Sequence, residues 1–163
     1  MKDGKLDDLD YDILQLLSEN SRENYSDIAE KLSKSHLTVK KHMDELFEAG
    51  IIEKYTIDIN YEKLGYDIIA LIELTIDKGK MLEVEEEIST DPNVFGVFDI
   101  TGEYDAIVLV RFKTRKELSE MVKRINSYEH VIRTNTHLIL NVKKKDVSFE
   151  KLLQYERSQS KKK

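Results

Sequence analysis

The apolar positions of the first 50 residues recur three or four residues apart, the spacing of one face of an α-helix. Asp7, Asn24 and Ser35 each precede such a segment and can cap its first turn. After Ser35 the apolar side chains stand at i, i+4, i+7 and i+8, namely at Val39, Met43, Leu46 and Phe47. Gly50 follows, where a glycine commonly ends a helix. We therefore predict three helices within residues 1–50.

The second and third predicted helices are separated only by Ser33, Lys34 and Ser35, the length of the turn in a helix-turn-helix. In such motifs the second helix enters the DNA major groove and places its first turns against the base edges. Small, hydroxyl and basic side chains suit that groove. The predicted DNA-binding residues are Ser35, His36, Leu37, Thr38, Lys40, Lys41 and His42.

In residues 51–59 the spacing of the apolar side chains changes from that of a helix to that of a strand. These residues alternate and are rich in β-branched side chains, which predicts a strand that serves as a wing or as a linker. Residues 60–65 resemble a turn before a second domain, so we assign residues 51–65 to a linker strand and turn.

The second predicted domain spans residues 66–145. Strand patterns at 66–76, 94–100, 104–112 and 131–142 alternate with a helix at 79–90 and a second helix that Thr114 and Glu117 begin as a capping box. We expect Met81, Leu82, Val84 and Ile88 in the first helix, and Leu118, Met121, Val122 and Ile125 in the second, to face inward. The order β-α-β-β-α-β predicts a ferredoxin-like domain. The fold class is thus α+β, with an N-terminal winged helix-turn-helix domain and a C-terminal ferredoxin-like domain.

The predicted sheet is apolar on both faces. Ile68, Ala70, Ile72 and Leu74 share one face with Ala106, Val108 and Val110, whereas Ile69, Leu71, Ile107 and Leu109 share the other. Both helices of a ferredoxin-like fold cover one face only, so the other requires a second cover. We predict a symmetric homodimer, which would also present two recognition helices to paired DNA half-sites.

Charge and composition narrow the function classes. The formal net charge is −6, and residues 1–60 hold 8 Lys/Arg against 14 Asp/Glu, which is unfavourable for DNA binding. Within them, however, residues 31–42 carry four lysines and no acid. The chain has no cysteine, which excludes disulfides, thiolate metal sites and cysteine nucleophiles. No apolar run is long enough for a membrane helix and the N-terminus lacks a signal-like apolar region, so we expect a cytoplasmic protein without a membrane partner.

Residues 146–163 form a basic C-terminal tail. Phe149, Leu152, Leu153 and Tyr155 predict one more amphipathic turn, followed by a disordered basic end.

From Leu6 to about Lys143 the chain resembles the Lrp/AsnC (leucine-responsive, feast/famine) family of transcription regulators. The resemblance rests on short motifs in a fixed order: Leu6-Asp7, Asp10 and Ile13-Leu14; Ser35-x-x-Thr38-Val39; Gly50-Ile51-Ile52; Leu64-Gly65; Thr101-Gly102-Glu103-Tyr104-Asp105; and Thr134-x-Thr136. The chain departs from the family pattern in the inter-helix turn, where Ser33 and Lys34 replace the usual apolar residue. It also has His42 where the family often has arginine.

The resemblance implies a regulator of transcription whose second domain assembles the oligomer, often an octamer, and senses an amino acid between dimers. Carried over by position, the candidate effector-binding residues are Gly102, Tyr104, Asp105, Thr134 and Thr136. A carboxylate for the ammonium group, with hydroxyl and backbone donors for the carboxylate group, suits a zwitterionic amino acid.

Two alternatives remain. Sirohaem decarboxylases also resemble this family, but they would be expected to carry basic and aromatic residues where this chain has Val94-Phe95-Gly96-Val97-Phe98-Asp99. A DNA-independent amino-acid-binding or architectural protein would explain the acidic N-terminal domain. We expect no catalytic residues and no cofactor other than a possible amino-acid effector. We expect no metal site, because the four histidines show no metal-binding spacing with a carboxylate.

Overall fold

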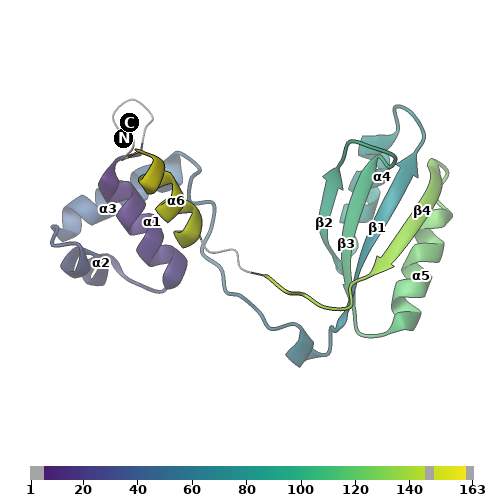
Figure 1. The fold of residues 1–163 in the computed structure, drawn as a ribbon, viewed down its shortest axis with the longest axis horizontal. Helices are drawn as coiled ribbons and strands as arrows, with labels where there is room; N and C mark the ends of the chain where they lie inside the picture. The colour runs from purple at the N-terminus through teal and green to yellow at the C-terminus, as the bar shows by residue number, and fades with distance from the viewer. Residues whose placement is uncertain (1–5, 146–148, 161–163) are drawn as a thin grey trace. The chain divides into compact units, whose positions relative to one another are not determined.

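The computed structural model describes residues 6–145 and 149–160, which form two compact units. One unit contains the described residues up to Asp58 and those from Lys145 onward, and the other spans Ile59–Lys144. The N-terminal and the C-terminal parts of the chain therefore both belong to the first unit (Figure 1).

Three helices of the first unit match the predicted helix-turn-helix: α1 (Asp8–Glu19), α2 (Tyr25–Lys31) and α3 (His36–Glu48). Each begins at the predicted cap. Asp7 and Asp10 form a capping box, the Asn24 side chain accepts from the amides of Ser26 and Asp27, and Ser35 Oγ accepts from Thr38 N. The buried core of this unit is Ile13, Leu17, Ile28, Ala29, Val39, Met43 and Leu46.

The helix-turn-helix uses left-handed backbone in its turn and after its second helix. Ser33, in the turn, has φ 53°, and Gly50, after α3, has φ 69°. Glycine adopts this conformation without strain, whereas serine does so at a cost. One predicted core residue is only partly covered: the Phe47 side chain is 38% exposed and its ring packs edge-on against Tyr55, with 5.3 Å between the ring centroids.

A fourth helix, α6 (Glu150–Ser160), completes the first unit by packing on α1 (Figure 1). Leu153 is fully buried there. The prediction of a single amphipathic turn was therefore wrong, because the apolar contact with α1 supports a full helix. Residues 146–148 and 161–163 of the predicted tail, like residues 1–5, lie outside the described part of the chain.

The second unit confirms the ferredoxin-like prediction. Its strands are β1 (Ile68–Ile76), β2 (Val94–Asp99), β3 (Ala106–Phe112) and β4 (Val131–Leu138), in the antiparallel order β2-β3-β1-β4. The helices α4 (Met81–Ser89) and α5 (Arg115–Asn126) lie on one face of this sheet (Figure 1). The core between helices and sheet is Ala70, Ile72, Leu74, Ile76, Val84, Ile88, Ala106, Val108, Val110, Phe112, Met121 and Ile125.

Within the second unit, no element covers the other face of the sheet (Figure 1). Register pairs Leu71 with Leu109 and Glu73 with Ile107, so these side chains lie on the uncovered face. Phe98, paired with Ile107, is 54% exposed. The predicted two-faced sheet is thus present, with its second face open.

Three local predictions need correction. Residues 51–59 form no strand, because no neighbouring strand pairs with them; after them come a short 3-10 helix, η1 (Glu62–Leu64), and a left-handed Gly65. β4 ends at Leu138 instead of residue 142, where its pairing with β1 runs out. Leu82, expected in the core, is 73% exposed on the first turn of α4.

Candidate nucleic-acid interface

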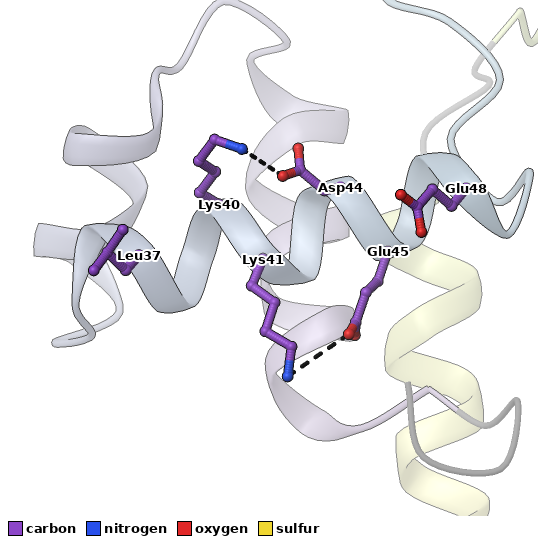
Figure 2. Close-up of a pocket in the computed structure, with 6 residues that line it drawn as sticks. All are labelled: Leu37, Lys40, Lys41, Asp44, Glu45 and Glu48. Atoms are coloured by element: carbon purple, nitrogen blue, oxygen red, sulfur yellow. Dashed lines mark hydrogen bonds and ion pairs between the residues drawn. The ribbon is translucent and has the colours of Figure 1, made fainter.

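The recognition helix α3 is fixed by its apolar stripe and presents the opposite side to solvent. Val39 and Leu46 are fully buried. Leu37 is 76% exposed, so its side chain is free to contact a groove. With Lys40, Lys41, Asp44, Glu45 and Glu48 it lines a shallow pocket along the helix (Figure 2).

The first turn of α3 is tied to its own cap. Ser35 Oγ and Thr38 Oγ1 are 2.7 Å apart, so these two predicted DNA-binding hydroxyls share a hydrogen bond in the free protein. His36 is exposed and its ring meets Tyr25 of α2 edge-on, with 5.6 Å between centroids. Ser35, His36, Leu37 and Thr38 therefore lie together at the start of the helix, as predicted.

The two lysines of this face are paired with acids one turn further along. Lys40 Nζ lies 2.5 Å from Asp44 Oδ2, and Lys41 Nζ lies 3.7 Å from Glu45 Oε1 (Figure 2). The hydrogen bond that Lys40 donates to Asp44, and then the charge of that carboxylate, raise the pKa of Lys40 above its ordinary value. Sequence spacing had assigned the lysines to a basic edge, and the structure adds the acids to the same surface.

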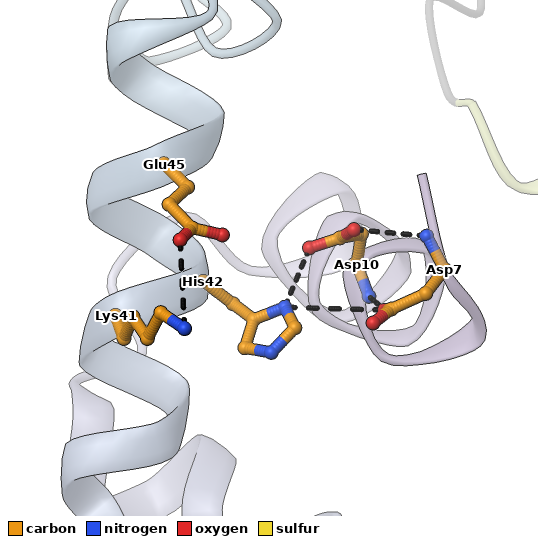
Figure 3. Close-up of polar contacts among 5 residues, drawn as sticks. All are labelled: Asp7, Asp10, Lys41, His42 and Glu45. Atoms are coloured by element: carbon orange, nitrogen blue, oxygen red, sulfur yellow. Dashed lines mark hydrogen bonds and ion pairs between the residues drawn. The ribbon is translucent and has the colours of Figure 1, made fainter. Parts of the chain in front are cut away.

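His42 does not lie on this face. Its Nδ1 is 2.7 Å from Oδ1 of Asp10, a carboxylate of α1 whose side chain is 2% exposed, and the His42 side chain itself is 16% exposed (Figure 3). Because an ionised carboxylate only accepts, the ring donates from Nδ1. The side chain thus fastens α3 to α1, and we leave it out of the proposed interface.

Asp7 completes this contact. It accepts from Asp10 N at 2.9 Å, and that hydrogen bond is the main reason that the pKa of Asp7 is below its ordinary value. Ligand-type atoms of Asp7, Asp10 and His42 all lie within 4.8 Å of one another. Spacing had indicated no histidine beside a carboxylate, because His42 and Asp10 are 32 residues apart. The capping box and the hydrogen bond between His42 and Asp10 already engage these groups, so the contact is explained as structural.

The predicted effector residues fall into two groups. Gly102 (φ 133°), Tyr104 and Asp105 form the turn between β2 and β3. Asp105 anchors that turn, because its Oδ2 accepts from Ile76 N at 2.8 Å. The Tyr104 ring lies under the Arg133 guanidinium, 4.7 Å from its centroid.

Thr134 and Thr136 lie on the face of β4 opposite to Arg133, since neighbouring side chains of a strand alternate. Thr134 Oγ1 exchanges hydrogen bonds with the Asn126 amide of α5 at 2.9 and 3.1 Å, whereas Thr136 is exposed. Within one chain the structure therefore does not bring the two threonines to the side of Arg133 and Tyr104.

A pair of carboxyl groups that the sequence did not predict, Glu85 and Asp99, lies near the turn between β2 and β3. Burial, and then the hydrogen bond and charge of Asp99, raise the pKa of Glu85 to about 7. Among the described residues, no donor reaches the buried Oε1 atom of Glu85. The only signal in the sequence is that both residues are acidic, because their contact joins α4 to the end of β2.

Comparison with known proteins identifies both units. Residues 6–53 match the model of a winged helix-turn-helix DNA-binding domain, and residues 69–149 match the Lrp/AsnC ligand-binding domain. An HTH-type transcriptional regulator of Pyrococcus furiosus is 40% identical over 146 residues, which cover 90% of this chain and 99% of that protein. The chain belongs to the Lrp/AsnC family. It is thus a member of a family of transcriptional regulators with a DNA-binding and a ligand-binding domain.

Further similar proteins are also transcriptional regulators. The regulator FL11 of P. furiosus is 33% identical, over 86% of this chain and 93% of its own. A transcriptional regulator of Neisseria meningitidis, solved in complex with L-Met, superposes with a TM-score of 0.81 at 26% identity, covering 89% of this chain and 96% of its own. Escherichia coli AsnC shares the fold, with a TM-score of 0.82 at 23% identity over 87% of this chain and 97% of its own. Within the described residues of this Lrp/AsnC protein, no helix is long and apolar enough to cross a membrane.

Proposed function

We propose that this Lrp/AsnC protein binds specific duplex DNA sites as a homodimer or a larger even-numbered assembly, and that an amino acid bound at an interface between its chains adjusts that binding. The observation that carries the proposal is the exposed side of α3, where Leu37, Lys40 and Lys41 stand opposite a fully buried stripe. Together with Ser35, His36 and Thr38, these side chains match the chemistry of a major groove.

The open face of the sheet supports assembly. Apolar side chains of β1, β2 and β3 cover it, and another copy of the same face would remove them from water by two-fold symmetry. Two copies of α3 would then be presented together, as paired half-sites require. Assembly of dimers to an octamer, which the family often shows, is the corresponding expectation for the larger form.

The effector proposal is supported by the turn that contains Gly102, Tyr104 and Asp105 and by the structural neighbour that holds L-Met. Asp105 and Thr134 have internal hydrogen bonds in the free chain, so a ligand would compete for them. Gly102 and Thr136 are the exposed candidates. Since Thr134 and Thr136 lie on the opposite side of β4 from Arg133, residues of different chains would have to combine, which fits a site between subunits.

DNA binding is tested by selecting duplexes from a randomised pool and measuring their affinity by fluorescence anisotropy. Lys40→Ala/Lys41→Ala should weaken binding of every duplex and reduce the slope of log K against log salt by about one unit for each lysine that contacts a phosphate. Lys116→Ala/Lys123→Ala on α5 removes the same charge from the other unit and should leave the slope unchanged. If no duplex binds even at low salt, the proposed function fails.

The amino-acid effector is tested by thermal-shift measurements with each of the twenty amino acids. A ligand that binds only the folded protein raises the melting temperature, and the active one should lose its effect in Tyr104→Ala. One observation favours the DNA-independent alternative, namely the acidic balance of residues 1–60. An amino acid that stabilises the protein in the absence of any DNA binding would establish that alternative instead.

A further inference from the structure

The DNA-facing side of α3 is divided into a basic and an acidic half. Leu37, Lys40 and Lys41 occupy the first two turns, and Asp44, Glu45 and Glu48 follow on the same pocket surface (Figure 2). The three acids outnumber the two lysines on this surface. A recognition surface that only attracts DNA would not carry them.

The acids also hold the lysines. Lys40 and Lys41 reach Asp44 and Glu45 as i,i+4 pairs, and Glu48 belongs to neither pair. Exposed pairs of this kind contribute little to stability, so a DNA phosphate can replace the carboxylate as the partner of each lysine. After that exchange, Asp44 remains as an uncompensated charge beside the DNA, together with Glu48.

Geometry puts these charges near the sugar-phosphate backbone. Leu37 and Glu48 are separated by about 16 Å along a helix that rises about 1.5 Å per residue, whereas the major groove is about 12 Å wide. With the N-terminal turns of α3 at the base edges, the C-terminal turns lie at or beyond the groove edge. A carboxylate and a phosphate at such a place repel each other over roughly a Debye length.

We propose that Asp44 and Glu48 weaken the binding of α3 to any DNA duplex, so that occupancy of a site depends on base contacts made by the first turns of the helix. The proposal rests on the DNA-binding function proposed above. Repulsion between carboxylates and phosphates does not depend on base sequence, and it lowers the affinity for all duplexes by a similar factor. Sequence-independent complexes, which rely on phosphate contacts, then fall below measurable occupancy first.

The test compares Asp44→Asn and Glu48→Gln with the parent protein on a mixed-sequence duplex about three helical turns long. Both substitutions preserve side-chain shape and remove one charge. Each should raise the affinity about threefold to tenfold at low salt and steepen the salt dependence, and the gain should shrink as salt is raised from about 50 to 200 mM. Glu120→Gln is the matched control, because Glu120 pairs with Lys116 at i,i+4 on α5 of the other unit.

Each outcome decides between the possibilities. Higher affinity in both variants with no change in Glu120→Gln supports repulsion by the acidic half. Higher affinity in Asp44→Asn alone would mean that the acid acts only by holding Lys40, and unchanged or lower affinity in both would mean that the acids do not oppose DNA; either result overturns the proposal. Failure of the parent and of all variants to bind DNA would instead refute the DNA-binding function. Circular dichroism of each variant verifies that α3 remains folded.

Discussion

At the scale of single residues, Glu85 links the stability of the second unit to pH. Its pKa is raised from 4.5 to about 7 by burial and by the Asp99 carboxyl, so the folded state favours the protonated acid. Between pH 4.5 and 7 the folded protein therefore binds more protons than the unfolded chain, and stability falls as the pH rises through this range.

Glu85→Gln should remove that loss. We expect the variant to be more stable than the parent by about 1–2 kcal/mol at pH 8, after allowance for solvent screening, and by much less at pH 5. Urea unfolding at the two pH values measures the difference. Glu86→Gln, at the exposed neighbouring residue, is the control. An equal gain in stability in both variants at both pH values would rule out the raised pKa of Glu85 as the cause.

His42 and His36 belong to the same helix, but replacing each by alanine should change the stability of the first unit by different amounts. His42→Ala leaves the buried Asp10 carboxylate with only the Asp7 amide as a donor, so we expect a loss of about 2–4 kcal/mol in the stability of the first unit. His36→Ala removes an exposed ring and should cost less than about 0.5 kcal/mol. Thermal or urea unfolding compares them, and similar losses would show that the Asp10 contact contributes little.

These residues also mark the limit of what the sequence could predict. The caps at Asp7, Asn24, Ser35 and Thr114 were all predicted and confirmed, because a cap and its target are at most three residues apart. The partner of His42 was missed because Asp10 is distant in the chain. The acids that pair with the lysines of α3 were also missed, although their i,i+4 spacing alone places them on the same surface of the helix.

At the scale of elements, α6 makes the DNA-binding unit discontinuous in sequence. The neighbouring leucines of this helix provide a matched pair: Leu153 is fully buried and Leu152 is 55% exposed. Leu153→Ala should destabilise the first unit by about 2–4 kcal/mol through the lost contacts and the cavity, whereas Leu152→Ala should be nearly neutral. Unfolding of the full chain, followed by hydrogen exchange of α1 amides, measures both, and equal effects would mean that α6 does not stabilise α1.

The elements that were predicted incorrectly share a cause. Residues 51–59 and 139–142 alternate like strands, but a strand forms only where a neighbouring strand pairs with it along its length. Among the described residues, 51–59 pair with no strand, and pairing with β1 ends after the hydrogen bond from Ile139 N to Ile69 O. The length of α6 was underestimated for the opposite reason. Its apolar positions are few, but their contact with α1 stabilises the helix. Periodicity predicts which face a segment buries, and tertiary contacts decide whether it forms.

At the scale of the whole molecule, the open face of the sheet is where we expect a second copy of the chain to bind. Leu71 lies near its centre, paired with Leu109 on one side and His137 on the other. The same face carries a polar group: Glu73 Oε2 accepts from Asn135 at 2.8 Å and lies 2.9 Å from His137 Nε2, and the hydrogen bond with His137 is the main cause of the lowered pKa of Glu73. Apolar side chains supply the area of a stable interface, and the polar group can fix its register.

Leu71→Glu should therefore separate the chains without unfolding them. The side chain points away from the helices, so the core that contains Ala70 and Ile72 is not disturbed, but a second copy would have to bury an unpaired carboxylate, at a cost of several kcal/mol. We expect sedimentation to show single chains at concentrations where the parent is a dimer or larger. Because two recognition helices then no longer bind together, affinity for a two-half-site duplex should fall by at least about a hundredfold.

The comparison that makes this decisive is Leu82→Glu, which places the same charge at an exposed leucine on the helical side of the sheet. If the sheet face is the interface, Leu82→Glu retains the assembly of the parent and Leu71→Glu loses it. If instead both variants sediment like the parent, the apolar sheet face is not what joins the chains. In that case the pairing of recognition helices must come from another surface, and the affinity of Leu71→Glu for a two-half-site duplex would stay unchanged.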